Sequence, residues 1–225
     1  MPVATGWTAE ARAQASGGIS GGNAHYAWTV RGMEDAISAG ATILDLGCGV
    51  GLFGTYLNER FNRKAHGLDV VRHAGFRDAD YASFELRNLE APAPAKRQFD
   101  YIFAIGLLEY LPNPRELIRS LPQLLAPNGK VVVTAPNPAS LRSIVSLLFR
   151  GEFSAFRESS NPASITPVLP VDLCRMFREA GLRDVTLDYS GSGRPPLLRS
   201  IRYQSIFPFL RGRLWSDDLR IIVSK

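Results

Sequence analysis

Short apolar runs and stretches of helical periodicity alternate along the first 135 residues. The runs are nearly continuous, as in buried parallel strands, and occupy residues 41–46, 64–71, 83–86, 99–105 and 130–135. Residues around Leu57 and over 115–125 carry apolar positions three and four apart, which predicts helices between the strands. This alternation predicts an α/β fold: a Rossmann-like, mostly parallel sheet with helices on both faces.

The two ends of the chain have a different pattern. Residues 1–24 are rich in glycine, alanine and serine and predict a mobile N-terminal arm that closes over something. From His25 to Ala39 apolar residues are spaced by three and four, which predicts one helix ended by Gly40. After Pro138 we expect further helices over 141–149 and 171–180, and strands over 183–189 and 219–224. These last two bring the expected number of strands to seven.

Length and composition are those of a globular protein. A chain of 225 residues, 45% hydrophobic and 21% charged, fits one domain spanning 1–225, with 140–170 and 190–218 as variable cap and substrate segments. No run approaches the roughly 18 apolar residues of a membrane span, and the N-terminus lacks the apolar core of a secretory signal. Two cysteines make no disulfide framework, so we predict a cytoplasmic protein.

The net charge of +5 lies entirely in the C-terminal part. Residues 1–139 hold thirteen basic and thirteen acidic side chains, and residues 140–225 hold thirteen and eight. The segment 189–215 contains five arginines and no acid. Such a segment attracts an anionic substrate, an anionic membrane surface or nucleic acid, or is simply a solvated face.

The most informative segment is Ile-Leu-Asp-Leu-Gly-Cys-Gly-Val-Gly at 43–51. Glycines that end a buried strand let the backbone approach a ligand, and the next helix begins there with unpaired N–H groups. Nucleotides bind at this edge of a parallel sheet. The sequence therefore predicts a nucleotide-type cofactor at this loop.

Two cofactors compete for the loop. Residues 49–54 match the dinucleotide pattern G-x-G-x-x-G, and Asp69 lies about twenty residues on, where NAD domains carry a ribose-binding acid. However, that pattern starts two residues late, and Asp45 would repel a pyrophosphate. A carboxylate there suits a cationic, phosphate-free ligand, so NAD remains the weaker alternative.

The segment 43–51 closely resembles the first motif of class I S-adenosylmethionine-dependent methyltransferases. Similar matches follow in family order at 67–70, 99–111, 125–137 and 177–182. The chain looks most like the broad subgroup that includes ubiquinone-pathway, small-molecule and glycan methyltransferases. The resemblance implies a final antiparallel strand pair, a helical cap insertion and S-adenosyl-L-methionine as the cofactor.

The resemblance also implies the cofactor contacts. Asp45 and the glycine loop would face the methionine end, Asp69 the ribose hydroxyls, and Asn88 the adenine, with Glu90 as the alternative. The full predicted set is Asp45, Gly47, Cys48, Gly49, Gly51, Asp69, Val70, Asn88, Leu89, Ala104 and Ile105. Cys48 is also consistent with a small packing residue. No metal site is expected, because three scattered histidines give no ligand spacing.

The general base is less well determined. Many relatives place a histidine in the loop after the fourth strand, where this chain has Glu109 and Tyr110. These two residues and His25 are the candidates. We predict methyl transfer to a small, anionic, lipid-linked or sugar-containing acceptor, with RNA ranked below these. Peripheral contact with an anionic membrane surface is one use of the basic segment. A non-catalytic relative that binds the cofactor, and an NAD-type binding domain, are the alternatives.

Overall fold

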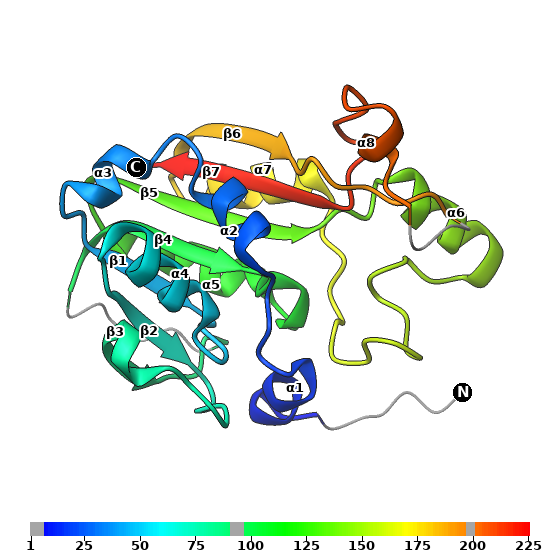
Figure 1. Ribbon diagram of the computed structural model, residues 1–225. Helices are drawn as coiled ribbons and strands as arrows, with labels where there is room; N and C mark the ends of the chain where they lie inside the picture. Colours follow the sequence, from blue (N-terminus) through cyan, green and yellow to red (C-terminus); the bar gives the residue numbers. More distant parts are fainter. Residues whose placement is uncertain (1–6, 91–96, 197–200) are drawn as a thin grey trace.

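The computed structural model describes residues 7–90, 97–196 and 201–225, so Arg199 lies outside the described residues. Seven strands form one sheet in the order β3-β2-β1-β4-β5-β7-β6 (Figure 1). The strands are β1 (Ile43–Leu46), β2 (Ala65–Asp69), β3 (Tyr81–Leu86), β4 (Phe99–Ile105), β5 (Leu125–Pro136), β6 (Arg183–Tyr189) and β7 (Asp218–Ser224). The predicted Rossmann-like fold is confirmed.

Five strands are parallel and the last two reverse the direction. β1 pairs with β2 and β4 in parallel, and β4 pairs in parallel with β5. β7 then inserts antiparallel between β5 and β6. Because the first five strands run the same way, their carboxyl ends share one edge, where a ligand site forms in open α/β sheets.

Helices cover both faces of the sheet, as their apolar spacing predicts. They are α1 (Ala9–Ser16), α2 (Asn23–Val30), α3 (Glu34–Ser38), α4 (Leu52–Phe61), α5 (Pro114–Leu124), α6 (Leu141–Arg150), α7 (Pro170–Glu179) and α8 (Tyr203–Ile206), with 3-10 turns η1 (Asp78–Asp80) and η2 (Leu108–Tyr110). One core cluster holds Leu117 of α5 and Phe177 of α7. The other holds Tyr26 of α2, Ile37 of α3 and Leu57 of α4.

The single helix expected over 25–39 is wrong, because the chain breaks between α2 and α3. Gly32 adopts a positive φ of 83°, which favours glycine. The side chain of Glu34 then accepts the N–H groups of Gly32 at 2.6 Å and Met33 at 2.9 Å. The apolar spacing survives the break, since Val30, Met33 and Ile37 are all buried.

The segment Pro127-Asn128-Gly129 has the composition of a turn but lies inside strand β5. Asn128 takes the left-handed conformation with φ 63°, and the register with β4 jumps from Phe99↔Leu125 to Tyr101↔Lys130. Residues 125–136 are therefore one strand with an irregularity rather than a turn followed by a strand.

The predicted cap segments gather at the functional edge of the sheet. Helix α6 and the segment around α8 both lie beyond the carboxyl ends of β4 and β5 (Figure 1). The N–H of Leu141 donates to the carbonyl of Leu214 at 2.8 Å, which joins the start of α6 to the segment after α8. Asn137 reinforces this junction by donating to the carbonyls of Arg213 and Ser216.

Candidate active site

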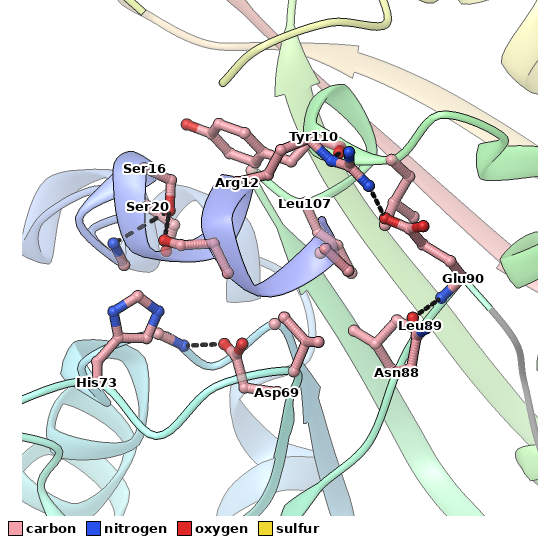
Figure 2. A pocket seen from close by; sticks show the side chains of 18 of the residues that line it. Arg12, Ser16, Ser20, Asp69, His73, Asn88, Leu89, Glu90, Leu107 and Tyr110 are labelled. Atoms are coloured by element: carbon pink, nitrogen blue, oxygen red, sulfur yellow. Dashed lines mark hydrogen bonds and ion pairs between the residues drawn. The ribbon is translucent and has the colours of Figure 1, made fainter. Parts of the chain in front are cut away.

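A cavity of about 620 Å³, counting its open mouth, lies at the carboxyl ends of β1, β2 and β4 (Figure 2). We call it the cofactor cleft. It is lined by Ala9, Arg12, Ala13, Ser16, Gly18, Ile19, Ser20, Gly47, Gly49, Asp69, Val70, His73, Asn88, Leu89, Glu90, Gly106, Leu107, Tyr110 and Leu111.

The glycine loop forms the floor of the cofactor cleft. Gly49 has a positive φ of 55°, and a Cβ atom there would collide with the carbonyl oxygen of Gly18. That carbonyl accepts the N–H of Val50 at 3.0 Å, so the N-terminal segment packs directly on the loop. Gly47 also has a positive φ, 68°, and a Cβ atom there would lie 2.8 Å from the side chain of Leu107. Glycine is therefore favoured by φ at both positions, and at Gly49 close approach of the backbone requires it as well.

Asp69 stands at the end of β2 and turns its carboxylate toward the loop. Its Oδ2 accepts the N–H of Gly49 at 2.8 Å, and its Oδ1 accepts the N–H of Val71 at 3.2 Å. The side chain is buried, yet it lines the cleft. A carboxylate offers about four lone-pair sites, so two N–H partners leave capacity for ligand hydroxyls. Asp69 can therefore hold the loop and a ligand together.

The far wall of the cleft is formed by residues that come shortly after strand β3 in the chain. The side-chain carbonyl of Asn88 accepts the N–H of Glu90 at 2.8 Å, which fixes a tight turn. Asn88, Leu89 and Glu90 all line the cleft, as Figure 2 shows. The structure thus brings both alternatives for adenine recognition, Asn88 and Glu90, to the same wall.

The N-terminal segment is not a featureless arm. Helix α1 begins at the Thr8 cap and lies across the cleft, where Arg12 is buried (Figure 2). Arg12 forms an ion pair with Glu90, and its guanidinium donates to the carbonyls of Tyr110 at 3.1 Å and Trp7 at 2.6 Å. An isolated arginine in an alanine-rich stretch gave no signal in the sequence for this role.

Five predicted cofactor residues lie behind the lining of the cleft. They are Asp45, Cys48, Gly51, Ala104 and Ile105. Asp45 accepts the hydroxyl of Tyr81 at 2.6 Å, and that hydroxyl accepts the N–H of Gly54 at 3.1 Å. Burial raises the pKa of Asp45 to about 7. Asp45 is therefore linked to the first turn of helix α4 through Tyr81, a residue that the sequence motif did not indicate.

The three candidate bases occupy different places. Tyr110 lines the cleft, and burial raises its pKa. His25 lies at the end of β5, where its Nε2 is 3.2 Å from the hydroxyl of Thr134, and burial lowers its pKa. Glu109 is buried beside Gly106, a residue that lines the cleft.

Glu109 is the most unusual of the three. A Cβ atom on Gly106 would lie 3.5 Å from its Oε1 and 3.4 Å from Ser20, so the carboxyl borders the inner end of the cleft. Its Oε2 is buried with no hydrogen-bond partner among the described residues. Burial raises its pKa to about 8, and the carboxylate of Asp218 adds to this. A buried, unpaired carboxyl beside a cavity is a typical proton-transfer group.

Comparison with known proteins assigns the fold and the site to a family. Residues 25–187 match the family model described as "Methyltransferase domain". The chain belongs to this methyltransferase-domain family. The match confirms the resemblance to class I S-adenosylmethionine-dependent methyltransferases and does not favour the NAD-type alternative.

A curated relative of this methyltransferase domain is the "Ubiquinone biosynthesis O-methyltransferase" of Neisseria meningitidis, 26% identical over 153 residues. The alignment spans 64% of each chain, so about a third of the relative is unmatched. A solved methyltransferase from Archaeoglobus fulgidus superposes with TM-score 0.60 and 20% identity, covering 89% and 98% of the two chains. The N-methyltransferase NodS of Bradyrhizobium japonicum gives 0.56 and 17%, covering 89% and 85%. These structures share the fold.

Within residues 7–90, 97–196 and 201–225, no group of three or more histidine, cysteine, aspartate or glutamate side chains is placed to hold a metal ion. Nor is any helix in those ranges both long and apolar enough to cross a membrane.

Proposed function

We propose that this methyltransferase domain transfers a methyl group from S-adenosyl-L-methionine to an oxygen of a small acceptor. The observation that carries the proposal is the cofactor cleft, in which the glycine loop and the Asp69 carboxylate meet at the carboxyl edge of the sheet. The curated relative named above is an O-methyltransferase, which makes oxygen the first acceptor atom to test. NodS was solved with S-adenosyl-L-homocysteine, which makes that product the natural probe.

The cleft residues fit this cofactor. Asp69 would accept the ribose hydroxyls with the lone pairs that Gly49 and Val71 leave open. Asn88 and Glu90 would contact the adenine, and the backbone of Gly47 and Gly49 the methionine part. The bound cofactor supplies a methyl group on a positively charged sulfur. The sulfur is the leaving group, and its positive charge already activates it. The chain's main task is then to align the acceptor with the methyl group and to exclude water. Correct orientation alone can accelerate the methyl transfer strongly.

Glu109 is the side chain best placed to take a proton from an acceptor hydroxyl. It borders the inner end of the cleft, and its pKa of about 8 is close to an ordinary working pH. Tyr110, whose backbone carbonyl is held by Arg12, is placed to position substrate. His25 bonds to Thr134 and lies at the end of β5. We assign the base role to Glu109 and positioning roles to the other two.

Calorimetric titration tests the proposal directly. The wild-type protein is expected to bind S-adenosyl-L-homocysteine with a Kd in the micromolar range, about −8 kcal/mol, and to give no heat with NAD. Binding of NAD alone would overturn the assignment. Binding of S-adenosyl-L-homocysteine, without turnover against a broad panel of phenols and catechols, would favour the non-catalytic relative.

We also propose that the domain works at the surface of an anionic membrane. Helix α6 buries Ser143 and presents apolar side chains to solvent, with Leu148 74% and Phe149 83% exposed. Near α8, Ile206 and Phe209 are 61% and 77% exposed. Arg150 directly follows Phe149, and the segment 189–215, which contains Ile206 and Phe209, holds five arginines and no acid. Exposed apolar residues beside unopposed positive charge are typical of interfacial binding to anionic lipid.

Vesicle sedimentation tests this surface. The protein is expected to sediment with vesicles of phosphatidylcholine and phosphatidylglycerol at three to one, and much less with phosphatidylcholine alone. Phe149→Ser should lower the vesicle-bound fraction severalfold, because the substitution removes an aromatic side chain from the membrane interface. Val171→Ser, at an exposed valine of α7, is the matched control and should bind normally. Equal sedimentation of wild type and Phe149→Ser would contradict the proposal.

A further inference from the structure

A second cavity opens beside the cofactor cleft, between α6, the loop after it, the segment after β6 and the start of β7. It measures about 1,090 Å³ when its open mouth is counted. Its lining consists of Pro136, Arg142, Ser154, Ala155, Arg157, Ser160, Ser192, Arg194, Asp217 and Asp218. We call it the arginine cavity, since three guanidinium groups from three separate segments converge there.

The positive charge in this cavity is only partly balanced. Arg142, Arg157 and Arg194 are all half-buried, so water screens their mutual repulsion less than on an open surface. Arg142 pairs with Asp217, at 3.6 Å between Nη1 and Oδ2. Among the described residues the guanidinium of Arg194 forms no hydrogen bond or ion pair, and only the backbone N–H of Arg194 donates to Asp217, at 3.4 Å. One carboxylate thus faces more than one guanidinium.

The second acid contributes less than a full negative charge near neutral pH. Burial raises the pKa of Asp218 to about 7, and the neighbouring Asp217 carboxylate adds to that rise while Arg194 opposes it. Three guanidinium groups thus line the cavity together with two carboxyl groups, so the cavity carries a net positive charge. The side chains of Ser154, Ser160 and Ser192 add hydroxyl groups to the lining.

Strand β5 connects the arginine cavity to the inner end of the cofactor cleft. Pro136, which lines it, pairs with Asp218 and lies two residues beyond Thr134 on β5. Thr134 accepts the N–H of Gly106, a residue of the cofactor cleft, at 3.0 Å. At about 3.3 Å per residue, two residues span roughly 7 Å. Asp218 is also close enough to Glu109 to raise its pKa.

We propose that the arginine cavity binds an anionic group of the methyl acceptor, a phosphate or a carboxylate, while the acceptor's nucleophile lies at Glu109. This assignment rests on the proposed methyl transfer. Guanidinium groups bind both anions in bidentate geometry, and the serine hydroxyls supply further donors.

Anion binding can be measured without any knowledge of the acceptor. Inorganic phosphate and benzoate are titrated into the protein at constant ionic strength set with chloride, and binding is followed by calorimetry. We expect saturable binding of at least one anion with a Kd in the millimolar range. Arg194→Ala should weaken it fivefold or more. Arg150→Ala removes the same charge from the exposed end of α6 and should have no effect.

Each outcome has a distinct meaning. Absence of saturable binding for both anions, or equal binding by Arg194→Ala and Arg150→Ala, would overturn the inference. Arg194→Gln, which keeps a long polar side chain, provides a second variant should the alanine variant not fold. Titration with S-adenosyl-L-homocysteine runs in parallel: its Kd should stay within twofold in both arginine variants. Failure of the wild type to bind that compound would instead count against the proposed methyl transfer.

Discussion

Replacement of Asp69 by alanine is expected to weaken binding of S-adenosyl-L-homocysteine more than tenfold, which corresponds to at least about 1.4 kcal/mol. The variant loses the acceptor for ligand hydroxyls and also the acceptors for the N–H groups of Gly49 and Val71. A buried N–H left without a partner carries its own penalty of about 1–3 kcal/mol. Calorimetric titration of purified variant and wild type measures the change.

Two further variants separate ligand contact from loop support. Asp69→Asn keeps a carbonyl oxygen for Gly49 but loses the charge and one acceptor, so we expect a smaller yet clear loss of affinity. Glu59→Ala removes an exposed acid of α4 outside the cleft and should bind as the wild type does. Unchanged affinity in both Asp69 variants would remove this residue from the cofactor site.

The second large effect is expected at Glu109. Glu109→Gln keeps the size of the side chain but cannot accept the acceptor's proton, so kcat should fall by about 10²–10⁴. The Kd for S-adenosyl-L-homocysteine should change little, because the carboxyl borders the cleft behind Gly106. Turnover is measured as product S-adenosyl-L-homocysteine, using phenols that also carry a phosphate or carboxylate.

The pH profile distinguishes a base from a structural group. A base acts in its ionised form, so wild-type kcat should rise with pH as the carboxyl loses its proton at a pKa of about 8. The glutamine variant should show a flat profile over the same range. An unaltered rise in Glu109→Gln would assign the base to another group, with Tyr110 the next to test.

Protein stability gives a readout of Glu109 that needs no acceptor. In the unfolded chain the carboxyl ionises near its ordinary pKa of 4.5, whereas in the folded protein it ionises at about 8. The stability that the neutral form provides is fully present below the lower value and is lost as pH rises through the higher one. The free energy of unfolding of Glu109→Gln should therefore fall less steeply across that interval, as measured by urea denaturation.

The sequence alone determined most of the fold. Strands β4 and β6 have the predicted bounds, and the other five differ mainly at their ends. The prediction was possible because short, continuous apolar runs between polar breaks are typical of buried parallel strands. The glycine loop could be recognised because positive φ and close approach leave glycine as the residue that fits. Asp69 followed from its position after β2, where the topology alone brings it to the loop.

Long-range packing decided the rest. No local pattern shows that Arg12 spans the cleft to Glu90, or that Tyr81 supports Asp45, since the partners are separated by 78 and 36 residues. The charged segment 189–215 was visible in the sequence, yet Arg194 is the one arginine among its described residues that lines the arginine cavity, and Arg142 and Arg157 come from elsewhere. Charge composition is a property of the chain, but the burial that shifts the pKa of Glu109 and gathers three arginines exists only after folding.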